Sequence, residues 1–166
     1  MTKIGVISDT HLPQRGMELP AEVMEAFKGV DMIIHAGDLV DLNVLEQLRK
    51  ICPHVKAVWG NMDPEKVRMK LPEKELIKSG KYTIGVIHGF GAPHNLVEIL
   101  TSAFKQDNVD VIIFGHSHSP MNQRIGKILF FNPGSAADKI FSSQTSCGIL
   151  EINDEIKGKI IEIKKG

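Results

Sequence analysis

Short apolar runs rich in β-branched residues recur along the chain, and each ends in a polar loop. In the first part of the chain, helical patterns separate three such runs, at residues 3–8, 31–35 and 55–59. Buried parallel strands read as continuous apolar runs, and a helix usually connects two parallel strands of one sheet. This order of strands and helices therefore predicts an α/β fold in which helices cover a parallel sheet.

The two segments between these strands have helical spacing. In residues 21–29, Val23, Met24 and Phe27 fall on one helical face, so we expect all three to be buried. Residues 41–50 form the second predicted helix. These two helices supply the connections that a parallel sheet requires.

The second half of the chain shows three pairs of strand-like runs around short turns. The turns are at Gly80-Lys81, Gly126-Lys127 and residues 153–155, and each is typical of an antiparallel hairpin. A helical pattern at 94–105 and a buried run at 111–114 complete this half. Hairpins added to a parallel core predict two mixed sheets packed face to face, with helices on the outside.

Length and composition exclude several function classes. The chain has 166 residues, of which 42% are hydrophobic and 24% charged, which fits one globular domain over residues 1–166. Twenty basic and twenty acidic residues give a formal net charge of zero, which argues against stable nucleic-acid binding and a polybasic membrane anchor. The sequence has no apolar run of ~18 residues and no signal pattern, and its two cysteines are too few for a disulfide scaffold. We therefore expect a cytoplasmic protein with no membrane association.

Candidate metal ligands occur in five places, and each place follows a predicted strand. They are Asp9-Thr10-His11, Gly37-Asp38, Gly60-Asn61-Met62-Asp63, His88-Gly89 and Gly115-His116-Ser117-His118. In open α/β sheets the carboxyl ends of the strands border one crevice, so five separate clusters can face one another. Asp9 and His11 are two residues apart, as are His116 and His118, and in extended chain each pair would project to one side.

These side chains are carboxylates, imidazoles and one amide, with no thiolate. Such ligands suit Mn²⁺, Fe²⁺, Ni²⁺ or Zn²⁺ better than a soft metal. Two ions ~3.5–4 Å apart need a shared carboxylate, and we expect Asp38 to be the bridge because its strand lies between the others in chain order. The ions bring about +4, and Asp9, Asp38 and a bridging hydroxide subtract about 3. The surplus of roughly one positive charge would attract a phosphate ester.

Each cluster taken alone also fits a purely structural role, such as a turn or a core histidine. The coincidence of all five at strand ends, however, favours a shared site. Five further residues are placed outside it. We expect His35 to be structural, His54 to lie at the surface, and Cys147 and Trp59 to belong to the core. Whether His94 starts a helix or contacts a substrate stays open.

The order of the motifs resembles that of the calcineurin-like metallophosphoesterase family. The motifs that carry the resemblance are Asp9-x-His11, Gly37-Asp38, Gly60-Asn61-x-Asp63, His88 and Gly115-His116-x-His118. The short chain, the residues SDTHLP at 8–13 and NPGS at 132–135 are similar to its small single-domain phosphodiesterase subfamily. The resemblance covers residues 1 to about 150.

This resemblance implies a four-layer α/β/β/α sandwich with two divalent metal ions. The first ion would be held by Asp9, His11, Asp38 and His118, and the second by Asp38, Asn61, His88 and His116. A metal-bridging hydroxide would attack phosphorus in line, with Asp38, Asn61 and His88 as the catalytic residues. Mn²⁺ is the favoured ion, and Ni²⁺, Fe²⁺, Zn²⁺ and Mg²⁺ are alternatives.

One position departs from the family pattern. Many members read Gly-Asn-His-Asp, whereas this chain has Met62 in the third place. The histidine would give a proton to the leaving group, and Asp63 would orient it, but a thioether has no proton to donate. General acid catalysis contributes ~10²–10⁴-fold, so we expect poor leaving groups to be hydrolysed slowly. The subfamily often lacks this histidine too, so Met62 does not imply inactivity.

The expected function is therefore hydrolysis of a small phosphodiester or nucleotide-like substrate, because the single charge of a diester matches the modest positive surplus. One alternative is a phosphomonoesterase. Another is a non-catalytic scaffold subunit of the retromer type, in which the metal site is degraded, but this chain retains every expected ligand. Its apolar hairpins are compatible with a homodimer.

Overall fold

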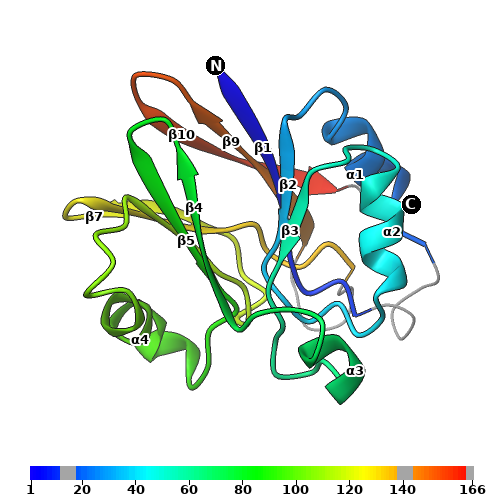
Figure 1. Cartoon of the computed structure of the whole chain (residues 1–166), viewed down its shortest axis with the longest axis horizontal. Helices are drawn as coiled ribbons and strands as arrows, with labels where there is room; N and C mark the ends of the chain where they lie inside the picture. Colours follow the sequence, from blue (N-terminus) through cyan, green and yellow to red (C-terminus); the bar gives the residue numbers. More distant parts are fainter. Residues whose placement is uncertain (12–17, 138–143, 164–166) are drawn as a thin grey trace.

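The computed structural model describes residues 1–11, 18–137 and 144–163, which form two five-stranded sheets (Figure 1). In chain order the elements are β1 (Thr2–Ile7), α1 (Ala21–Ala26), β2 (Met32–His35), α2 (Asn43–Arg49), β3 (Val55–Ala57), α3 (Glu65–Arg68), β4 (Lys74–Ser79), β5 (Tyr82–Ile87), the 3₁₀ helix η1 (Pro93–Asn95), α4 (Leu96–Ala103), β6 (Val111–Ile113), β7 (Met121–Ile125), β8 (Ile128–Asn132), β9 (Thr145–Ile152) and β10 (Ile156–Ile163). Leu12 and Pro13 of the SDTHLP motif lie outside the described residues.

Both sheets are mixed, as predicted, with three strands paired in parallel and hairpin strands paired antiparallel. The first has the order β10-β9-β1-β2-β3, in which β1, β2 and β3 pair in parallel. The second has the order β4-β5-β6-β8-β7, in which β5, β6 and β8 pair in parallel. The hairpin partners β10, β4 and β7 are antiparallel edge strands. The loops after the parallel strands of both sheets therefore lie at the same end of the molecule, the lower end in Figure 1.

The sheets face each other, and the helices cover their outer faces (Figure 1). The core between the sheets is formed by alternate strand residues, such as Ile4 and Val6 of β1 and Ile84 and Val86 of β5. A second core joins α1 and α2 to the first sheet, and a third joins α4 to the second. Three cores between four layers confirm the α/β/β/α arrangement.

Two strand glycines let each outer layer approach its sheet closely. A Cβ atom on Gly5 of β1 would lie 2.9 Å from the ring of Phe27, and one on Gly85 of β5 would lie 2.6 Å from the ring of Phe104. Both phenylalanines directly follow a helix, α1 and α4, and both are buried. Glycine is therefore required where an aromatic ring packs against the strand backbone.

All the predicted strands and helices are present, and the differences are local. Met24 is 39% exposed, in contrast to the buried Val23 and Phe27, because α1 is only six residues long and buries a narrow face. The short helix α3 was not expected; it begins after Pro64 and contains one buried residue. No helix in the described ranges is long and apolar enough to span a bilayer.

Candidate metal centre

The seven predicted ligands lie in loops that follow strands of both sheets, and these loops are joined by backbone hydrogen bonds. Asp9 and His11 follow β1, Asp38 follows β2, Asn61 follows β3, His88 follows β5, and His116 and His118 follow β6. The N–H groups of Asp9 and His11 donate to the carbonyls of Gly37 and Asp38, each at 3.0 Å. The N–H of Gly115 donates to the carbonyl of His88 at 3.1 Å. The carboxyl ends of the strands thus meet in one place, as predicted.

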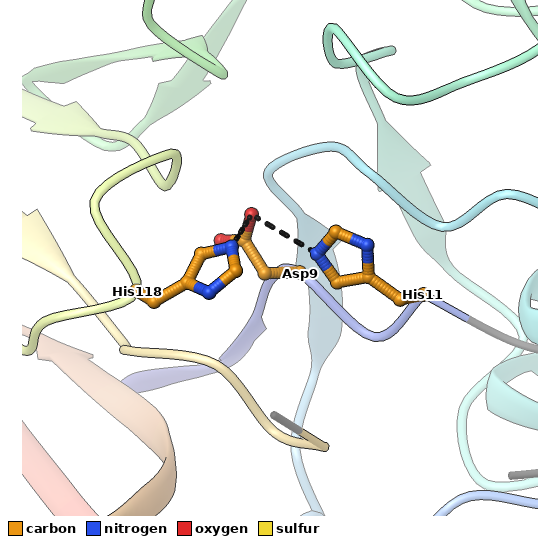
Figure 2. Close-up of side chains that lie close together, drawn as sticks. All are labelled: Asp9, His11 and His118. Atoms are coloured by element: carbon orange, nitrogen blue, oxygen red, sulfur yellow. Dashed lines mark ion pairs between the residues drawn. The ribbon is translucent and has the colours of Figure 1, made fainter. Parts of the chain in front are cut away.

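Asp9, His11 and His118 form a first group around one carboxylate oxygen (Figure 2). Asp9 Oδ1 lies 3.3 Å from His118 Nε2 and 3.8 Å from His11 Nε2. The two imidazole rings are 5.2 Å apart and meet edge to face. Three donor atoms within 4.8 Å of one another have the spacing of ligands to one ion.

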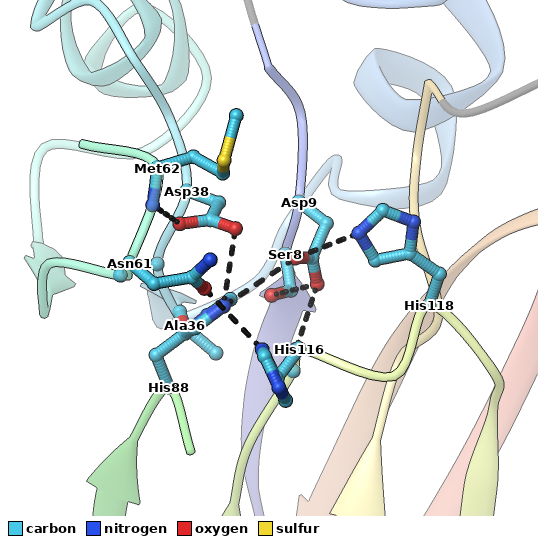
Figure 3. A network of polar contacts seen from close by, with 12 residues as sticks. Ser8, Asp9, Ala36, Asp38, Asn61, Met62, His88, His116 and His118 are labelled. Carbon is cyan, nitrogen blue, oxygen red and sulfur yellow. Dashed lines mark hydrogen bonds and ion pairs between the residues drawn. The ribbon is translucent and has the colours of Figure 1, made fainter. Parts of the chain in front are cut away.

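Asp9, Asp38 and His88 form a second group that shares Asp9 with the first. His88 Nε2 lies 3.2 Å from Asp38 Oδ2 and 3.7 Å from Asp9 Oδ1 (Figure 3). Asp38 Oδ2 also lies 4.0 Å from His11 Nε2. Asp38 faces residues of both groups, as a bridge requires, but Asp9 occupies a more central position than chain order suggested.

Asn61 and His116 lie beside the second group. Asn61 Oδ1 is 3.3 Å from His116 Nδ1, and the His116 ring lies 5.5 Å from the ring of His88. All seven side chains are therefore connected through short contacts, and none of the seven lies apart from the others.

The hydrogen bond from His88 to the backbone determines which ring nitrogen faces the carboxylates. The carbonyl of Ala36 can only accept, so His88 Nδ1–H donates to it, at 2.8 Å. In the neutral ring, Nε2 then points a lone pair at Asp38 Oδ2. Burial lowers the pKa of His88, but the charges of Asp9 and Asp38 and the contacts of its ring with Asp38 and the Ala36 carbonyl raise it to about 9. Without a cation this nitrogen holds a proton, and a divalent ion would take the place of that proton.

The ring of His116 is also oriented by a backbone carbonyl. Its Nε2 lies 2.8 Å from the carbonyl of Gly91 and must donate to it. In the neutral ring, Nδ1 and Asn61 Oδ1 are then two acceptors facing each other at 3.3 Å. Two facing acceptors favour a cation between them.

Two buried atoms at the centre of the cluster are left without a hydrogen bond. Asp9 Oδ1 and His88 Nε2 have no hydrogen-bond partner among the described residues. Buried polar atoms are almost always satisfied, so such a pair calls for a missing partner. Burial raises the pKa of Asp9, but His88 and His118 outweigh burial and lower it, so its carboxylate is ionised. A charged oxygen, imidazole lone pairs and an amide oxygen are a donor set that fits a divalent cation.

The ligands reach the centre through left-handed backbone turns, so the expected extended geometry is wrong. The φ angles of Asp9, His11, Asp38, His116 and His118 are 53°, 51°, 60°, 72° and 63°. His116 and His118 consequently do not share one side, because His116 lies beside Asn61 and His118 beside Asp9. Asp9 and His11 do converge, with 3.8 Å between Asp9 Oδ1 and His11 Nε2. Non-glycine residues in this region are strained, and such strain concentrates at functional sites.

The glycines of two motifs are needed because ligand carboxylates pack directly against them. A Cβ on Gly60 would lie 2.2 Å from Asp38 Oδ1. A Cβ on Gly115 would lie 2.1 Å from Ser8 Oγ and 2.6 Å from Asp9 Oδ2. Any side chain at these positions would displace a carboxylate.

Three further residues support the ligands. Ser8 donates its hydroxyl to Asp9 Oδ2 at 2.7 Å, and Asn132 donates its amide to the carbonyl of Gly115 and the hydroxyl of Ser117, each at 3.1 Å. Sequence reasoning gave Ser8 and Asn132 no role of their own, although both stand in motifs that carry the resemblance. Asp63, the third, was expected to orient a side chain at position 62.

The structure assigns Asp63 a different role. Its Oδ2 accepts from the N–H groups of Asp38 and Gly60 at 3.0 and 2.8 Å, and its Oδ1 accepts from that of Val40 at 2.6 Å. Both oxygens are thus used to join the loops after β2 and β3. Burial is the largest cause of the raised pKa of Asp63. Met62 is 51% exposed, and its N–H donates to Asp38 Oδ1 at 2.8 Å.

The remaining histidines lie outside the cluster. His35 is fully buried; its Nδ1 accepts from Gly37 N–H and its Nε2 bonds to Thr10 Oγ1, each at 3.1 Å, so it is structural, as expected. His54 and His94 are exposed. Cys147 is a core residue, and burial raises the pKa of its thiol to about 12. Trp59 packs against the core but is only half-buried, and it also lines a hollow beside the site.

Known proteins share this fold and this sequence pattern. Residues 2–155 match the model of the calcineurin-like phosphoesterase superfamily domain. A probable metallophosphoesterase of Methanocaldococcus jannaschii is 40% identical over 98% of this chain and 82% of its own. A phosphodiesterase of the same organism is 28% identical over 90% of this chain and 92% of its own.

The fold is also shared with solved structures. The Vps29 of Entamoeba histolytica complexed with Zn²⁺ superposes with a TM-score of 0.79 at 27% identity, over 97% of this chain and 99% of its own. The family match spans nearly the whole chain and includes every loop that contributes to the cluster. The chain therefore belongs to the calcineurin-like phosphoesterase superfamily.

Proposed function

We propose that residues 1–166 form one catalytic domain that hydrolyses phosphodiesters with the help of two divalent cations. The observation that carries the proposal is the set of facing lone pairs at the centre of the cluster: Asp9 Oδ1, Asp38 Oδ2 and His88 Nε2. With the Nδ1–H of neutral His88 donated to the carbonyl of Ala36, its Nε2 and Asp38 Oδ2 are two acceptors that face each other at 3.2 Å, an arrangement that favours added positive charge. Without this positive charge, the carboxylates of Asp9 and Asp38 and the lone pair of His88 Nε2 would repel one another.

In this proposal the seven side chains form two ligand sets that share Asp38. Asp9, His11, Asp38 and His118 would hold the first, and Asp38, Asn61, His88 and His116 the second. Bound there, the two cations would supply a hydroxide nucleophile for in-line attack and neutralise charge on the phosphoryl oxygens. Mn²⁺ is the proposed ion, with Ni²⁺, Fe²⁺, Zn²⁺ and Mg²⁺ as alternatives; the zinc complex of the Entamoeba Vps29 supports a divalent ion in this fold.

The protein holds the three proposed catalytic side chains in fixed orientations. Met62 N–H fixes Asp38 Oδ1, the carbonyl of Ala36 fixes the tautomer of His88, and His116 lies against the amide of Asn61. Because these groups are oriented before substrate arrives, little reorganisation is required during the reaction.

Three observations favour diesters over monoesters. The proposed charge surplus of about +1 matches a substrate with one negative charge. Position 62 offers no proton for a poor leaving group, and the relative from Methanocaldococcus jannaschii is named a phosphodiesterase. Small phosphodiesters and nucleotide-like diesters are the proposed substrates.

The scaffold role of the Vps29 type has less support. Among the described residues, the exposed large apolar side chains are spread over several elements and loops: Met1 before β1, Met24 on α1, Met62 before α3, Met69 after α3, Leu76 on β4, Phe90 after β5 and Ile125 on β7. A protein-binding scaffold typically presents such residues as a contiguous patch.

The test is hydrolysis of bis(p-nitrophenyl) phosphate and p-nitrophenyl phosphate by metal-free protein supplied with each candidate ion. We expect activity only with added metal, greater on the diester, and loss of at least ~100-fold in Asp38→Asn, which removes the proposed bridge. Lys28→Gln, an exposed change just after α1, is the control and should be neutral. Greater turnover of the monoester would identify a phosphatase, and inactivity with every ion would favour the scaffold role.

A further inference from the structure

A small hollow opens beside the cluster, between the loop after β3 and the loop after β5. Its volume is about 240 Å³. Its lining includes Trp59, Asn61, Arg68, Glu73, His88 and Phe90. Asn61 and His88 belong to both the hollow and the proposed metal centre, so a group bound in the hollow would sit next to the phosphorus (Figure 3 shows both side chains). The remaining lining residues have no part in the proposed chemistry.

The walls of the hollow are aromatic and aliphatic. Trp59 is half-buried, Ile87 is buried, and Phe90 is 54% exposed. Phe90 is the only phenylalanine of the described residues with a large exposed fraction, whereas the others are buried in the cores. An exposed aromatic ring beside a reaction centre offers a flat apolar face to a ligand.

Arg68 adds a positive charge to these walls. Its guanidinium carbon lies 4.5 Å from the centre of the Trp59 ring. Its Nε donates to the carbonyl of Asp63 and its Nη2 to that of Asn61, at 2.9 and 3.0 Å. In the described part of the chain it forms no ion pair with a carboxylate. One face of the guanidinium is covered by Trp59, while the residue as a whole is exposed and available for stacking.

We propose that this hollow binds the nucleoside part of a nucleotide diester, a proposal that rests on the phosphodiesterase function argued above. A nucleobase has two apolar faces and a polar edge. The rings of Trp59 and Phe90 and the guanidinium of Arg68 match the faces, and the carboxylate of Glu73 can accept from the amino or hydroxyl groups of the edge.

The size of the hollow limits what it binds. Its volume is below the ~300–1,000 Å³ of sites for drug-sized ligands, so it takes one base and its sugar and not an oligonucleotide. The formal net charge of zero agrees with a mononucleotide ester, because polymeric nucleic acid requires a basic surface.

The kinetic test compares two diesters that share one leaving group. Thymidine 5′-(p-nitrophenyl phosphate) presents a nucleoside, and methyl p-nitrophenyl phosphate presents a methyl group in its place. In the metal-loaded protein we expect kcat/KM to be higher for the thymidine ester. Phe90→Ala should lower kcat/KM about 5- to 10-fold for the thymidine ester only. This factor corresponds to the low end of the free energies found for base–aromatic stacking. Ile125→Ala, an exposed apolar change on the distant strand β7, should affect neither ester.

A binding measurement provides a second readout that does not depend on turnover. Trp59 is the single tryptophan of the chain, so its fluorescence reports directly on the hollow. Adenosine 5′-monophosphate should change it saturably, ribose 5-phosphate should change it little, and Phe90→Ala should weaken only the binding of adenosine 5′-monophosphate.

The outcomes separate the two proposals. If the methyl ester is hydrolysed as fast as the thymidine ester, or Phe90→Ala slows both equally, the nucleoside site is wrong and the phosphodiesterase function stands. If neither ester is hydrolysed with any ion, the phosphodiesterase function is wrong. The fluorescence titration then still tests whether the hollow binds a nucleoside. Equal responses to adenosine 5′-monophosphate and ribose 5-phosphate would show that it does not.

Discussion

The imidazoles of His88 and His116 each donate one N–H to a backbone carbonyl, which leaves the other nitrogen to face the centre of the cluster. Ser8 and Asp63 act similarly on the carboxylate side, since Ser8 holds one oxygen of Asp9 and Asp63 holds the backbone of Asp38. Orientation by partners of this kind typically changes metal affinity or activity by ~10–100-fold. The chemistry of this site therefore depends on more atoms than the ligand atoms themselves.

His35 gives a prediction about acid stability. Burial, the largest effect, lowers its pKa to about 3, against 6.5 in the unfolded chain. Between these values the unfolded chain binds a proton that the folded chain does not, so the free energy of unfolding falls as pH falls, by up to ~1.4 kcal/mol per pH unit. His35→Gln removes this titration. We expect urea titrations with chelator present to show a stability difference between the two proteins that narrows from pH 6.5 to 4; a constant difference would show that His35 does not carry the effect.

Met62 gives a prediction about leaving groups. With no proton donor at this position, the rate should depend steeply on the pKa of the leaving alcohol. Met62→His should help poor leaving groups by less than the ~10²–10⁴-fold of a full general acid, because both oxygens of Asp63 are already bonded to backbone N–H groups. Rates for a series of substituted aryl diesters measure both effects. A shallow dependence in the unmutated protein would mean that another group donates the proton.

At the scale of elements, the strands and the ligand clusters were predictable because both are local in sequence. The apolar runs predicted β1, β2, β5 and β6, and the polar residues after these runs predicted the ligands. The left-handed turns at Asp9 and Asp38 were not predictable, because contacts between loops impose them against the residues' own preference. The central place of Asp9 also depends on packing between sheets. The exposure of Met24 and the helix α3 follow from element length, which periodicity in short segments does not resolve.

Gly115 gives a prediction at this scale. In Gly115→Ala the new Cβ would meet Ser8 Oγ and Asp9 Oδ2, so the loop after β6 must move away from β1. We expect activity to fall by at least ~10-fold through weaker metal binding. Gly126→Ala is the control: it adds a Cβ with nothing within 4 Å, at a φ of +62°, and should cost ~1 kcal/mol of stability without loss of activity. Equal activity in the two variants would mean that this close approach does not matter.

In the whole molecule, the site lies where the two sheets meet, since the loops after β1, β2 and β3 come from one sheet and those after β5 and β6 from the other. The first sheet contributes the carboxylates of Asp9 and Asp38, the second contributes the imidazoles of His88, His116 and His118, and a cation would join groups from both sheets. Metal binding should therefore stabilise the packing of the two sheets as well as the loops.

This coupling predicts that metal raises the melting temperature. Free metal at 100 times its Kd adds ~2.7 kcal/mol, which for a chain of this size corresponds to roughly 5–10 °C. Thermal unfolding with and without Mn²⁺ measures the shift. Asp38→Asn should lose most of it, while Lys28→Gln should keep it; a shift retained in Asp38→Asn would place the stabilising ion elsewhere.

The central claim is that seven side chains from both sheets hold two divalent cations. Anomalous diffraction from crystals grown with Mn²⁺ tests it most directly. We expect two peaks ~3.5–4 Å apart, one beside Asp9, His11 and His118 and one beside Asn61, His88 and His116, with Asp38 between them. A single peak, or two peaks that Asp38 does not join, would contradict it.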